Sequence, residues 1–240
     1  MPGRLPSLSF FFPAYNEALT VEAVVREGLA KLPRFADDIE IVVIDDGSSD
    51  RTGEISDRLA AEDARVRVVH HRPNRGYGGA VRSGLVSATR EYVFFTDGDL
   101  QFDLDDLERL IPRLERADVV VGYREKRADP PKRLLIAFVY NTLIRILFLA
   151  PFRDVDCAFK LFKRDVFTRV PLSRVRSNGA FFSPELLLVL RAAGVRIEQV
   201  GVRHFPRRFG EEKGATMRVV LRAIRDLLRL RLRLLLRPGS

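Results

Sequence analysis

Short apolar runs alternate with longer amphipathic segments through the first half of the chain. Residues 8–12, 40–44, 66–70, 92–96 and 118–122 are rich in β-branched and aromatic side chains, which predicts five strands. The run at 40–44 (EIVVI) is nearly all β-branched, as is typical of a central parallel strand covered on both faces.

Apolar residues at helical spacing lie between these runs. They predict helices over about 19–32, from a cap at Ser49 or Asp50 to about 64, from a Gly-rich turn at 74–79 through 88, and over 104–115. Strands alternating with helices predict βαβ units and a mostly parallel central sheet flanked by helices, an α/β fold.

Beyond residue 124 the regular alternation stops. A polar link leads to predicted helices at about 134–149 and 184–193, a mixed segment with short strands between them, a strand at 195–202 and a basic helix over about 217–236. The stretch 134–152 is interrupted by Asn141 and Arg145, and we expect it not to span a membrane.

Polar residues follow four of the five predicted strands at the edge where α/β sheets bind ligands. They are Asn16 and Glu17, Asp45 and Asp46, Asp97 to Asp99, and Arg124.

Charge adds a preference for anions. The chain has 41 Lys and Arg against 32 Asp and Glu, a net charge of +9, and basic residues crowd into 203–237. Nucleic acid, acidic lipid or a phosphorylated ligand would each suit this distribution. The single cysteine, Cys157, excludes an internal disulfide, and the three histidines have no familiar zinc spacing. We expect no signal peptide.

The Asp97-Gly98-Asp99 segment offers two carboxylates to one hard cation, and Mg²⁺ or Mn²⁺ would suit such oxygen ligands and bridge to substrate phosphates. An ordinary acidic turn is the alternative. A carboxylate at Asp45 or Asp46 can accept hydrogen bonds from a base or a ribose hydroxyl, although helix capping would also explain an acid there. The Gly-rich turn matches neither the P-loop nor the dinucleotide pattern.

Taken in order, four motifs become specific. Pro13-Ala14-Tyr15-Asn16-Glu17, Asp45-Asp46-Gly47-Ser48, Asn74-Arg75-Gly76 and Asp97-Gly98-Asp99-Leu100-Gln101 together closely resemble the GT-A-fold family 2 glycosyltransferases. Later segments, such as those around Arg124, Asp156, Glu185 and Arg207, resemble the branch of dolichol-phosphate mannose synthases and other polyprenyl-phosphate glycosyltransferases. The resemblance covers about residues 7–215.

The resemblance implies a role for individual positions. The residues that would line the nucleotide are Pro13, Ala14, Tyr15, Glu17, Asp45, Asp46, Gly76, Asp97 and Gly98. Asp97, Asp99 and Gln101 would hold the metal and the diphosphate. Four arginines would face the donor and acceptor phosphates: Arg124, Arg133, Arg207 and Arg208, of which the last two lie on an acceptor loop.

The implied reaction is transfer of a sugar, with inversion, from a UDP- or GDP-sugar to a polyprenyl phosphate. A cation and arginines would stabilise the leaving diphosphate, with Asp99, Arg124 and Arg207 as catalytic candidates. A phosphate acceptor is already anionic and needs no strong base. A sugar hydroxyl acceptor would need one, and Asp154, Asp156 and Glu185 are the candidates, with Asp156 and Glu185 first. Capping or ion pairing are their alternative roles.

We expect a catalytic domain over 1–215, with a nucleotide-sugar half (1–124) and an acceptor half (125–215), followed by a basic helix at 216–240. Leu and Arg dominate that helix, which favours a membrane surface over packing on the protein's own core or binding of nucleic acid. We therefore expect a cytoplasmic protein peripheral to the inner face of the membrane, with no nucleic-acid partner.

Three other functions stay open. One is a family 2 transferase with a soluble or cell-envelope sugar acceptor, and another is a sugar nucleotidyltransferase, which would need a Gly-rich basic loop after its first strand. The third is a catalytically silent lipid-binding module.

Overall fold

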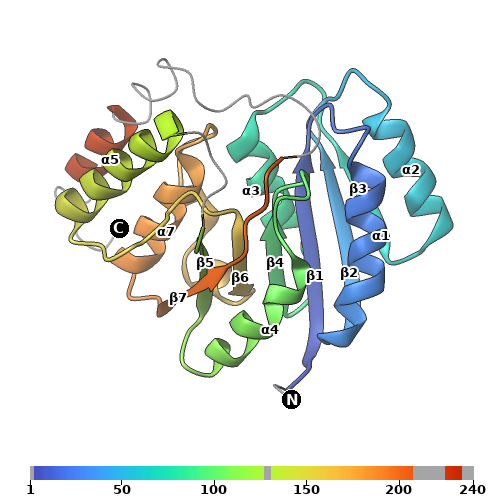
Figure 1. Ribbon diagram of the computed structural model, residues 1–240, viewed down its shortest axis with the longest axis horizontal. Helices are drawn as coiled ribbons and strands as arrows, with labels where there is room; N and C mark the ends of the chain where they lie inside the picture. The colour runs from blue at the N-terminus through green and yellow to red at the C-terminus, as the bar shows by residue number, and fades with distance from the viewer. Residues whose placement is uncertain (1–2, 127–130, 208–224, 234–240) are drawn as a thin grey trace.

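A seven-stranded sheet forms the centre of the protein. The computed structural model describes residues 3–126, 131–207 and 225–233 (Figure 1). The strands are β1 (Leu5–Ala14), β2 (Ala36–Asp45), β3 (Val66–His70), β4 (Tyr92–Thr96), β5 (Val119–Arg124), β6 (Phe159–Lys163) and β7 (Ile197–Val202), in the order β3-β2-β1-β4-β6-β5-β7. Strands β3, β2, β1 and β4 are parallel, as are β5 and β7, so the predicted α/β fold is confirmed.

Strand β6 runs antiparallel between β4 and β5. Its reversal brings the residues that precede it to the edge where β4 and β5 end. Asp154 and Asp156 therefore approach the same edge as Asp97 and Arg124.

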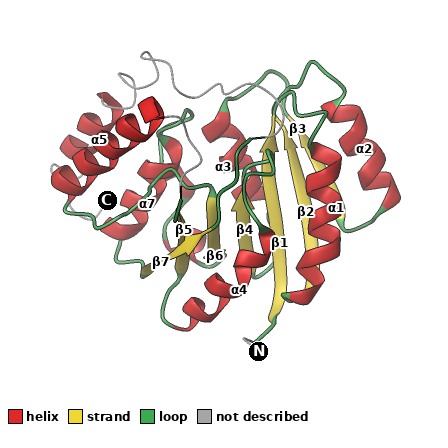
Figure 2. Ribbon diagram, viewed as in Figure 1, coloured by secondary structure: helices red, strands yellow, loops and turns green. Residues whose placement is uncertain are grey.

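Helices flank the sheet (Figure 2). They are α1 (Val21–Lys31), α2 (Thr52–Glu62), α3 (Tyr77–Ser87), α4 (Leu107–Leu110), α5 (Pro131–Phe148), α6 (Val166–Arg169), α7 (Phe182–Ala192) and a helix at 225–233, with 3₁₀ turns η1 (Leu32–Arg34), η2 (Leu104–Asp106), η3 (Ile111–Glu115) and η4 (Leu172–Arg174). The continuous helix predicted over 104–115 is wrong, because this segment divides into η2, α4 and η3. Pro112 lies in η3, where its missing N–H and its ring disfavour a continuous α-helical ladder.

The core is built on phenylalanines of the central strands. Phe10 and Phe11 point to opposite faces of β1 and are both fully buried, which requires helices on both faces. Phe10 stacks on Phe94 with centroids 5.3 Å apart, and Phe11 on Phe95 at 5.2 Å. A Cβ at Gly84 of α3 would lie 2.0 Å from the Phe11 ring, so this glycine lets α3 pack closely on β1.

The acid Glu40 is buried in the central sheet. Glu40 on β2 accepts hydrogen bonds from the hydroxyl of Ser9 (2.6 Å) and the amide of Thr89 (2.7 Å), and it pairs with Arg67 at 2.7 Å. Burial by itself would raise the pKa of Glu40, but these three groups together outweigh it and lower the pKa to about 2. The acid therefore ties β1, β2 and β3 to the segment before β4.

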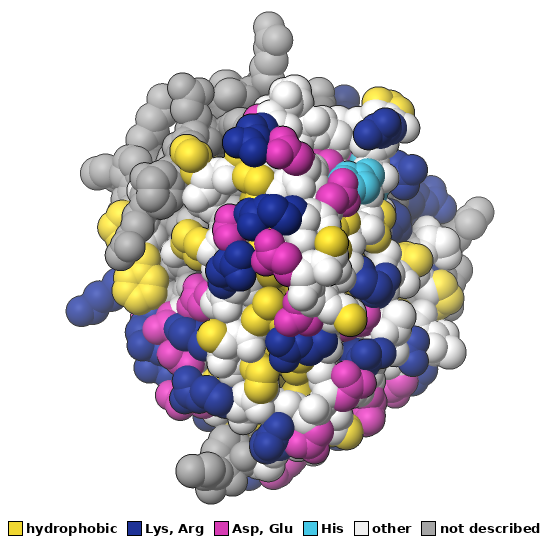
Figure 3. Space-filling model, turned by 90° about the vertical axis from the view of Figure 1, so that its right-hand side faces the viewer, with side chains coloured by type: hydrophobic (Ala, Val, Ile, Leu, Met, Phe, Trp, Pro, Cys, Tyr) yellow, Lys and Arg dark blue, Asp and Glu magenta, His cyan; other side chains and the backbone are white. Residues whose placement is uncertain are grey.

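Charges of both signs are intermixed on the α2 side of the molecule (Figure 3). Arg58 of α2, for example, pairs with Glu22 at 2.7 Å and with Glu62 at 2.9 Å. A face on which basic residues alternate with acids offers little to a polyanion such as nucleic acid.

The helix at 225–233 packs against the protein itself on one side. Leu227 and Leu230 are fully buried, and Arg233 donates to the Glu185 carboxylate at 2.9 Å. Leu228 and Leu232, by contrast, are 50% and 59% exposed. The side of this helix that carries Leu227 and Leu230 therefore packs on the protein's own core. Among the described helices, none has the length and apolar content needed to cross a membrane.

Candidate active site

Two carboxylates follow β4 at the carboxyl edge of the sheet. Asp99 is 8% exposed, and Asp97 is partly buried and accepts the Tyr77 hydroxyl at 3.1 Å. Burial and the nearby Asp99 carboxylate raise the pKa of Asp97 to about 7, although Tyr77 and more distant cations oppose the shift. Burial also raises the pKa of Asp99. The charges of Asp97 and Asp99 repel each other, and a cation placed between them would remove that cost.

Arginine 207 supplies positive charge beside this pair. Its guanidinium contacts Glu17 at 2.6 Å and lies 3.7 Å from a carboxylate oxygen of Asp99. Glu17 follows β1, so this contact shows that the loops after β1 and β4 meet at one place. Gly98 fits the same junction, because a Cβ there would lie 3.1 Å from the carbonyl oxygen of Pro13.

The loop after β1 is held by the loop after β2. The Asn16 amide donates to the Ser48 hydroxyl (3.0 Å), the Ser49 amide donates to the Asn16 side-chain oxygen (2.8 Å), and the Glu17 amide donates to the Thr52 hydroxyl (2.8 Å). Asn16 has φ of 55°, a left-handed conformation that asparagine tolerates better than most residues. These cross-links fix Glu17 before any ligand binds.

Asp50 links the same loops. Its carboxylate accepts the Thr52 amide at 2.9 Å at the start of α2 and the Ala18 amide at 3.1 Å from the other loop. Of the two caps predicted for this helix, Asp50 is therefore the one that bonds to the first turn.

Tandem histidines hold the tandem carboxylates at the end of β2. His70 Nδ1 lies 2.8 Å from Asp45, and His71 Nδ1 lies 2.6 Å from Asp46. The Asp45 carboxylate, and then Asp57, raise the pKa of His70. From the sequence, the histidines were considered only as zinc ligands, and their spacing did not fit that role. The doubled Asp and the doubled His at the ends of β2 and β3 point to the contact only once the two strands are known to pair with Asp45 opposite His70.

Arg124 is fixed by an acid that precedes β6. Its guanidinium bonds to both oxygens of Asp154, at 2.6 Å and 2.8 Å. Lys160, which is 1% exposed, donates to the Cys157 carbonyl nearby, and burial lowers its pKa. The Lys160 and Arg124 charges both act on Asp97, so they lie within electrostatic reach of the acidic pair.

The remaining predicted residues occupy varied positions. Glu185 is fully buried and bonds to the Ser177 amide at 2.8 Å as well as to Arg233. Asp156 is exposed. Burial and the Asp97 charge are the main causes that raise the pKa of Tyr77, and the Asp156 charge adds to this shift. Gln101 donates its side-chain amide to the Phe205 carbonyl at 3.0 Å.

Other predicted residues frame the edge or fall outside what is described. Ala14 is buried and Tyr15 is 41% exposed. Gly76 has φ of +77° at the start of α3. The side chain of Arg133 and the whole of Arg208 lie outside the described residues.

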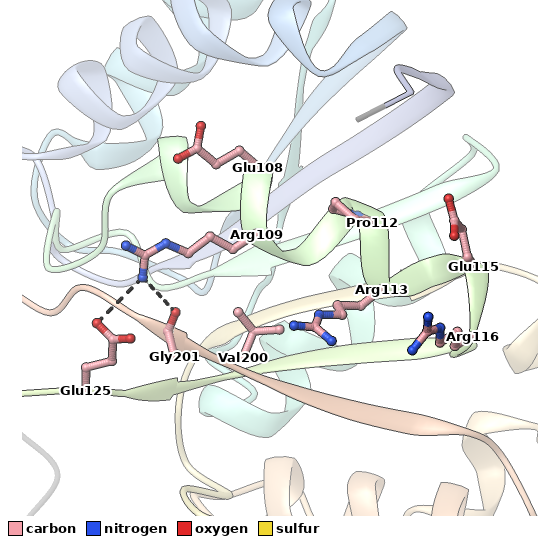
Figure 4. A pocket seen from close by; sticks show the side chains of 9 residues that line it. All are labelled: Glu108, Arg109, Pro112, Arg113, Glu115, Arg116, Glu125, Val200 and Gly201. Atoms are coloured by element: carbon pink, nitrogen blue, oxygen red, sulfur yellow. Dashed lines mark hydrogen bonds and ion pairs between the residues drawn. The ribbon is translucent and has the colours of Figure 1, made fainter. Parts of the chain in front are cut away.

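A pocket of about 540 Å³ lies between the α4–η3 segment and strand β7 (Figure 4). In it, Arg109 donates to the Gly201 carbonyl at 3.1 Å and lies 3.6 Å from Glu125. The pocket is lined by none of the predicted site residues, and arginines and glutamates alternate around it. The strand-end acids therefore remain the candidate site. Within the described ranges no group of three or more His, Cys, Asp or Glu could by itself enclose a metal ion.

The mostly parallel sheet with acids at its carboxyl edge agrees with the GT-A fold that the motifs implied. A family model, Glycosyl transferase family 2, matches residues 9–170, and the chain belongs to this family. Membership decides between the transferase and nucleotidyltransferase interpretations in favour of the transferase.

Relatives of the chain are polyprenyl-phosphate transferases and similar enzymes. Glycosyltransferase AglD of Haloferax volcanii is 36% identical over 239 residues, which cover 96% of this chain but 38% of that protein. The dolichyl-phosphate beta-glucosyltransferase of Saccharomyces cerevisiae is 26% identical over 257 residues, and the matched region covers 95% of this chain and 75% of that protein. For undecaprenyl-phosphate mannosyltransferase of Micrococcus luteus the identity is 26%, with 84% of each chain covered. These relatives are consistent with the polyprenyl-phosphate branch.

Solved structures confirm the fold. Glucosyl-3-phosphoglycerate synthase from Mycobacterium tuberculosis, in complex with phosphoglyceric acid, superimposes with a TM-score of 0.70 at 22% identity, over 95% of this chain and 80% of that one. The same enzyme has been solved with Mn²⁺, UDP and glucosyl-3-phosphoglycerate, with a TM-score of 0.69, 22% identity and the same coverage.

Proposed function

We propose that this chain transfers a sugar, with inversion, from a UDP- or GDP-sugar to a polyprenyl phosphate, using Mg²⁺ or Mn²⁺ at Asp97 and Asp99. The observation that carries the proposal is the pair of carboxylates after β4, with Asp99 buried, Asp97 partly buried, and Glu17 and Arg207 beside them. Such a cluster is costly to the free protein and becomes favourable when a cation and a diphosphate enter.

The residues fit a divalent ion of this kind. Mg²⁺ is commonly held by one or two carboxylates together with substrate phosphates, so Asp97 and Asp99 suffice without a complete protein cage. When bound, the ion would neutralise charge on the departing diphosphate. Gln101, the third predicted ligand, is held beside Asp99 by its backbone amide, which donates to that carboxylate at 3.2 Å.

The protein's own cations would complete this stabilisation. Arg124, the last residue of β5, is oriented by Asp154. Arg207, in the segment after β7, contacts Glu17 and Asp99. Both guanidinium groups are held in advance, so they would cost little reorganisation as negative charge develops. An anionic phosphate acceptor would then attack without a general base, whereas Asp156 would be the base in the alternative with a hydroxyl acceptor.

An apolar face on α5 supports a membrane-bound acceptor. Phe138, Val139, Ile146 and Leu149 are 67%, 48%, 66% and 80% exposed, and their spacing puts them on one side of the helix and its end. Leu228 and Leu232 of the helix at 225–233 add to the exposed apolar surface. We propose that this surface rests on the lipid headgroups, which would place the protein in the cytoplasm at the inner face of the cell membrane.

Donor binding is the first test. A thermal-shift series with UDP, GDP and their sugars should give one nucleotide family that raises the melting temperature only when Mn²⁺ or Mg²⁺ is present. A ligand at one hundred times its Kd adds about 2.7 kcal/mol. Asp99→Ala should abolish the shift, and Asp105→Ala, a matched change on the same segment, should retain it. No shift with any nucleotide would overturn the proposal.

The acceptor is tested separately by phase partition. Transfer of labelled sugar from the donor that binds should place label in the organic phase with an undecaprenyl or dolichyl phosphate acceptor. Label that stays in the aqueous phase with a soluble phosphorylated acceptor would replace the lipid by a soluble substrate. Flotation with anionic vesicles tests the surface, and the Phe138→Ser, Ile146→Ser double variant should float less than the wild type.

A further inference from the structure

The tandem carboxylates of β2 are not equivalent. Asp45 uses both of its oxygens within the protein, since Oδ1 accepts the Ser48 amide at 3.0 Å and Oδ2 lies 2.8 Å from His70. Asp46 uses only Oδ1, which accepts the Arg75 amide at 2.8 Å and lies 2.6 Å from His71. From the described part of the chain, no hydrogen bond reaches Oδ2 of Asp46.

That second oxygen is open to a ligand. The Asp46 side chain is only 4% exposed, yet the protein does not enclose this oxygen, so a ligand at the edge of the sheet can reach it. The Asp46 amide donates to the Ala14 carbonyl at the end of β1, which fixes the residue at the ligand edge of the sheet. A ligand that brings an N–H or a hydroxyl to this edge would complete the carboxylate.

The histidine that holds Asp46 is itself held. His71 is 1% exposed, and its Nε2 lies 2.8 Å from the hydroxyl of Ser83 on α3. A carboxylate oxygen only accepts, so Nδ1 carries the proton toward Asp46, while Nε2 is engaged by the Ser83 hydroxyl. The chain Ser83–His71–Asp46 thus fixes the direction of the carboxylate from the helix behind it.

A second set of contacts clamps the same residue from the front. The Asn74 side-chain amide donates to the Asp46 carbonyl at 2.7 Å, and Asn74 also accepts the Gly76 amide at 2.9 Å. The Gly-rich turn therefore closes around Asp46. The corresponding acid Asp45 is joined through His70 to Asp57 of α2, on the side of the sheet facing that helix.

We propose that His71 with Ser83 forms a positioning relay for Asp46, the acid that the proposed donor site presents to the nucleoside. This inference rests on the proposed donor site. The group recognised is a donor of one or two hydrogen bonds, such as a base N–H or a ribose hydroxyl, presented to Oδ2 of Asp46. His71 acts through the carboxylate and touches no reacting atom.

Two substitutions at one position separate the relay from simple packing. In His71→Asn the amide nitrogen lies near the place of Nδ1 and can still donate to Asp46. In His71→Gln the amide reaches toward the place of Nε2 and loses that bond. We expect His71→Gln to weaken nucleotide binding about ten-fold or more, as the loss of a charged hydrogen bond predicts, and His71→Asn to recover most of it.

The measurements are titration calorimetry with the nucleoside diphosphate and Mn²⁺, and steady-state kinetics. The KM for the donor should rise with little change in kcat, because the relay affects binding of the nucleoside and not the departure of the sugar. His70→Gln, the same change at the neighbouring histidine, should leave the Kd unchanged. Equal losses at His70 and His71 would overturn the relay, because they would show that neither histidine acts specifically through Asp46.

Two failures are distinguishable. A wild-type protein that binds no nucleotide with any metal refutes the donor site itself. A wild type that binds, with folded His71→Gln of equal affinity, refutes only the relay. If His71→Gln does not fold, Ser83→Ala tests the same chain of contacts, since it keeps the ring and removes its anchor. Wild-type affinity in that variant would count against the relay.

Discussion

The Asp97 carboxylate should destabilise the protein when no cation is bound, so Asp97→Asn should stabilise it. In the unfolded chain this acid loses its proton near its ordinary pKa of 3.8, whereas in the folded protein its pKa is about 7. Stability therefore falls as the pH rises from about 4 to about 7, and the whole cost is present above pH 7.

The size of this effect follows from the same shift. A difference of about three pH units corresponds to a ceiling of about 4 kcal/mol. Local relaxation and the remaining Asp99 charge reduce what an amide recovers, and we expect a gain of about 1–2 kcal/mol at pH 8. The Tyr77 hydroxyl can still donate to the amide oxygen, so this hydrogen bond is kept.

The assay is urea denaturation at pH 5 and pH 8 in the presence of a chelator. Asp97→Asn should be more stable than the wild type at pH 8, with a smaller difference at pH 5. With Mn²⁺ and the nucleotide, only the wild type should gain further stability.

Asp103→Asn on the same segment is the matched control with the opposite sign. Lys31 lies 2.9 Å from Asp103, and its hydrogen bond helps hold the pKa of this acid below its ordinary value against the effect of burial. The control should lose stability at pH 8. Our reasoning about the acidic pair would be refuted if Asp97→Asn were the less stable protein at pH 8 without metal, or if it kept the metal-dependent gain.

Three further changes test the framework around the site. Glu40→Gln should lower the free energy of unfolding by about 2 kcal/mol at pH 7 and remove the stability that the wild type loses between about pH 4.5 and 2, as urea titrations across this range would show. Gly84→Ala should cost about 1–3 kcal/mol in the same assay, because its Cβ would overlap the Phe11 ring, and an unchanged midpoint would contradict the close packing. Glu185→Gln weakens the bond to Arg233, and limited proteolysis should cut the helix at 225–233 faster than in the wild type.

The apolar patterns predicted the first half of the fold well because most of its strands, β1, β2 and β4, are largely buried. Such strands have few polar interruptions, and the bounds of Val66–His70 and Tyr92–Thr96 agree with the structure. Residues that follow these strands could be placed at one edge without knowing the strand order, because parallel strands all end on the same side. For this reason the acids after β2 and β4 were predicted together.

Strand β6 was harder to predict. Its sequence, FKLFK, places Lys160 within the sheet, where the structure buries it against Phe95 and the Cys157 carbonyl. From the sequence, a buried lysine looks like a solvent-facing residue of an amphipathic strand. The local pattern also does not tell which strands will be its neighbours in the sheet. The antiparallel insertion and the Arg124–Asp154 pair that depends on it therefore followed only from the three-dimensional structure.

The histidine contacts were missed for a related reason. Asp45 and His70 become neighbours only through the register of β2 with β3. Composition and spacing do not carry that register. Once two strands are known to pair with those residues opposite each other, the doubled Asp and doubled His would be expected to meet.

The cross-links between the loops after β1 and β2 have a consequence for protein engineering. Asn16, Ser48, Ser49 and Thr52 bond across the two loops, so neither loop holds its conformation alone. A chimera that takes one loop from another enzyme would leave amides of the other without acceptors. Changing the nucleotide preference by grafting should therefore succeed only when both loops are exchanged as a pair.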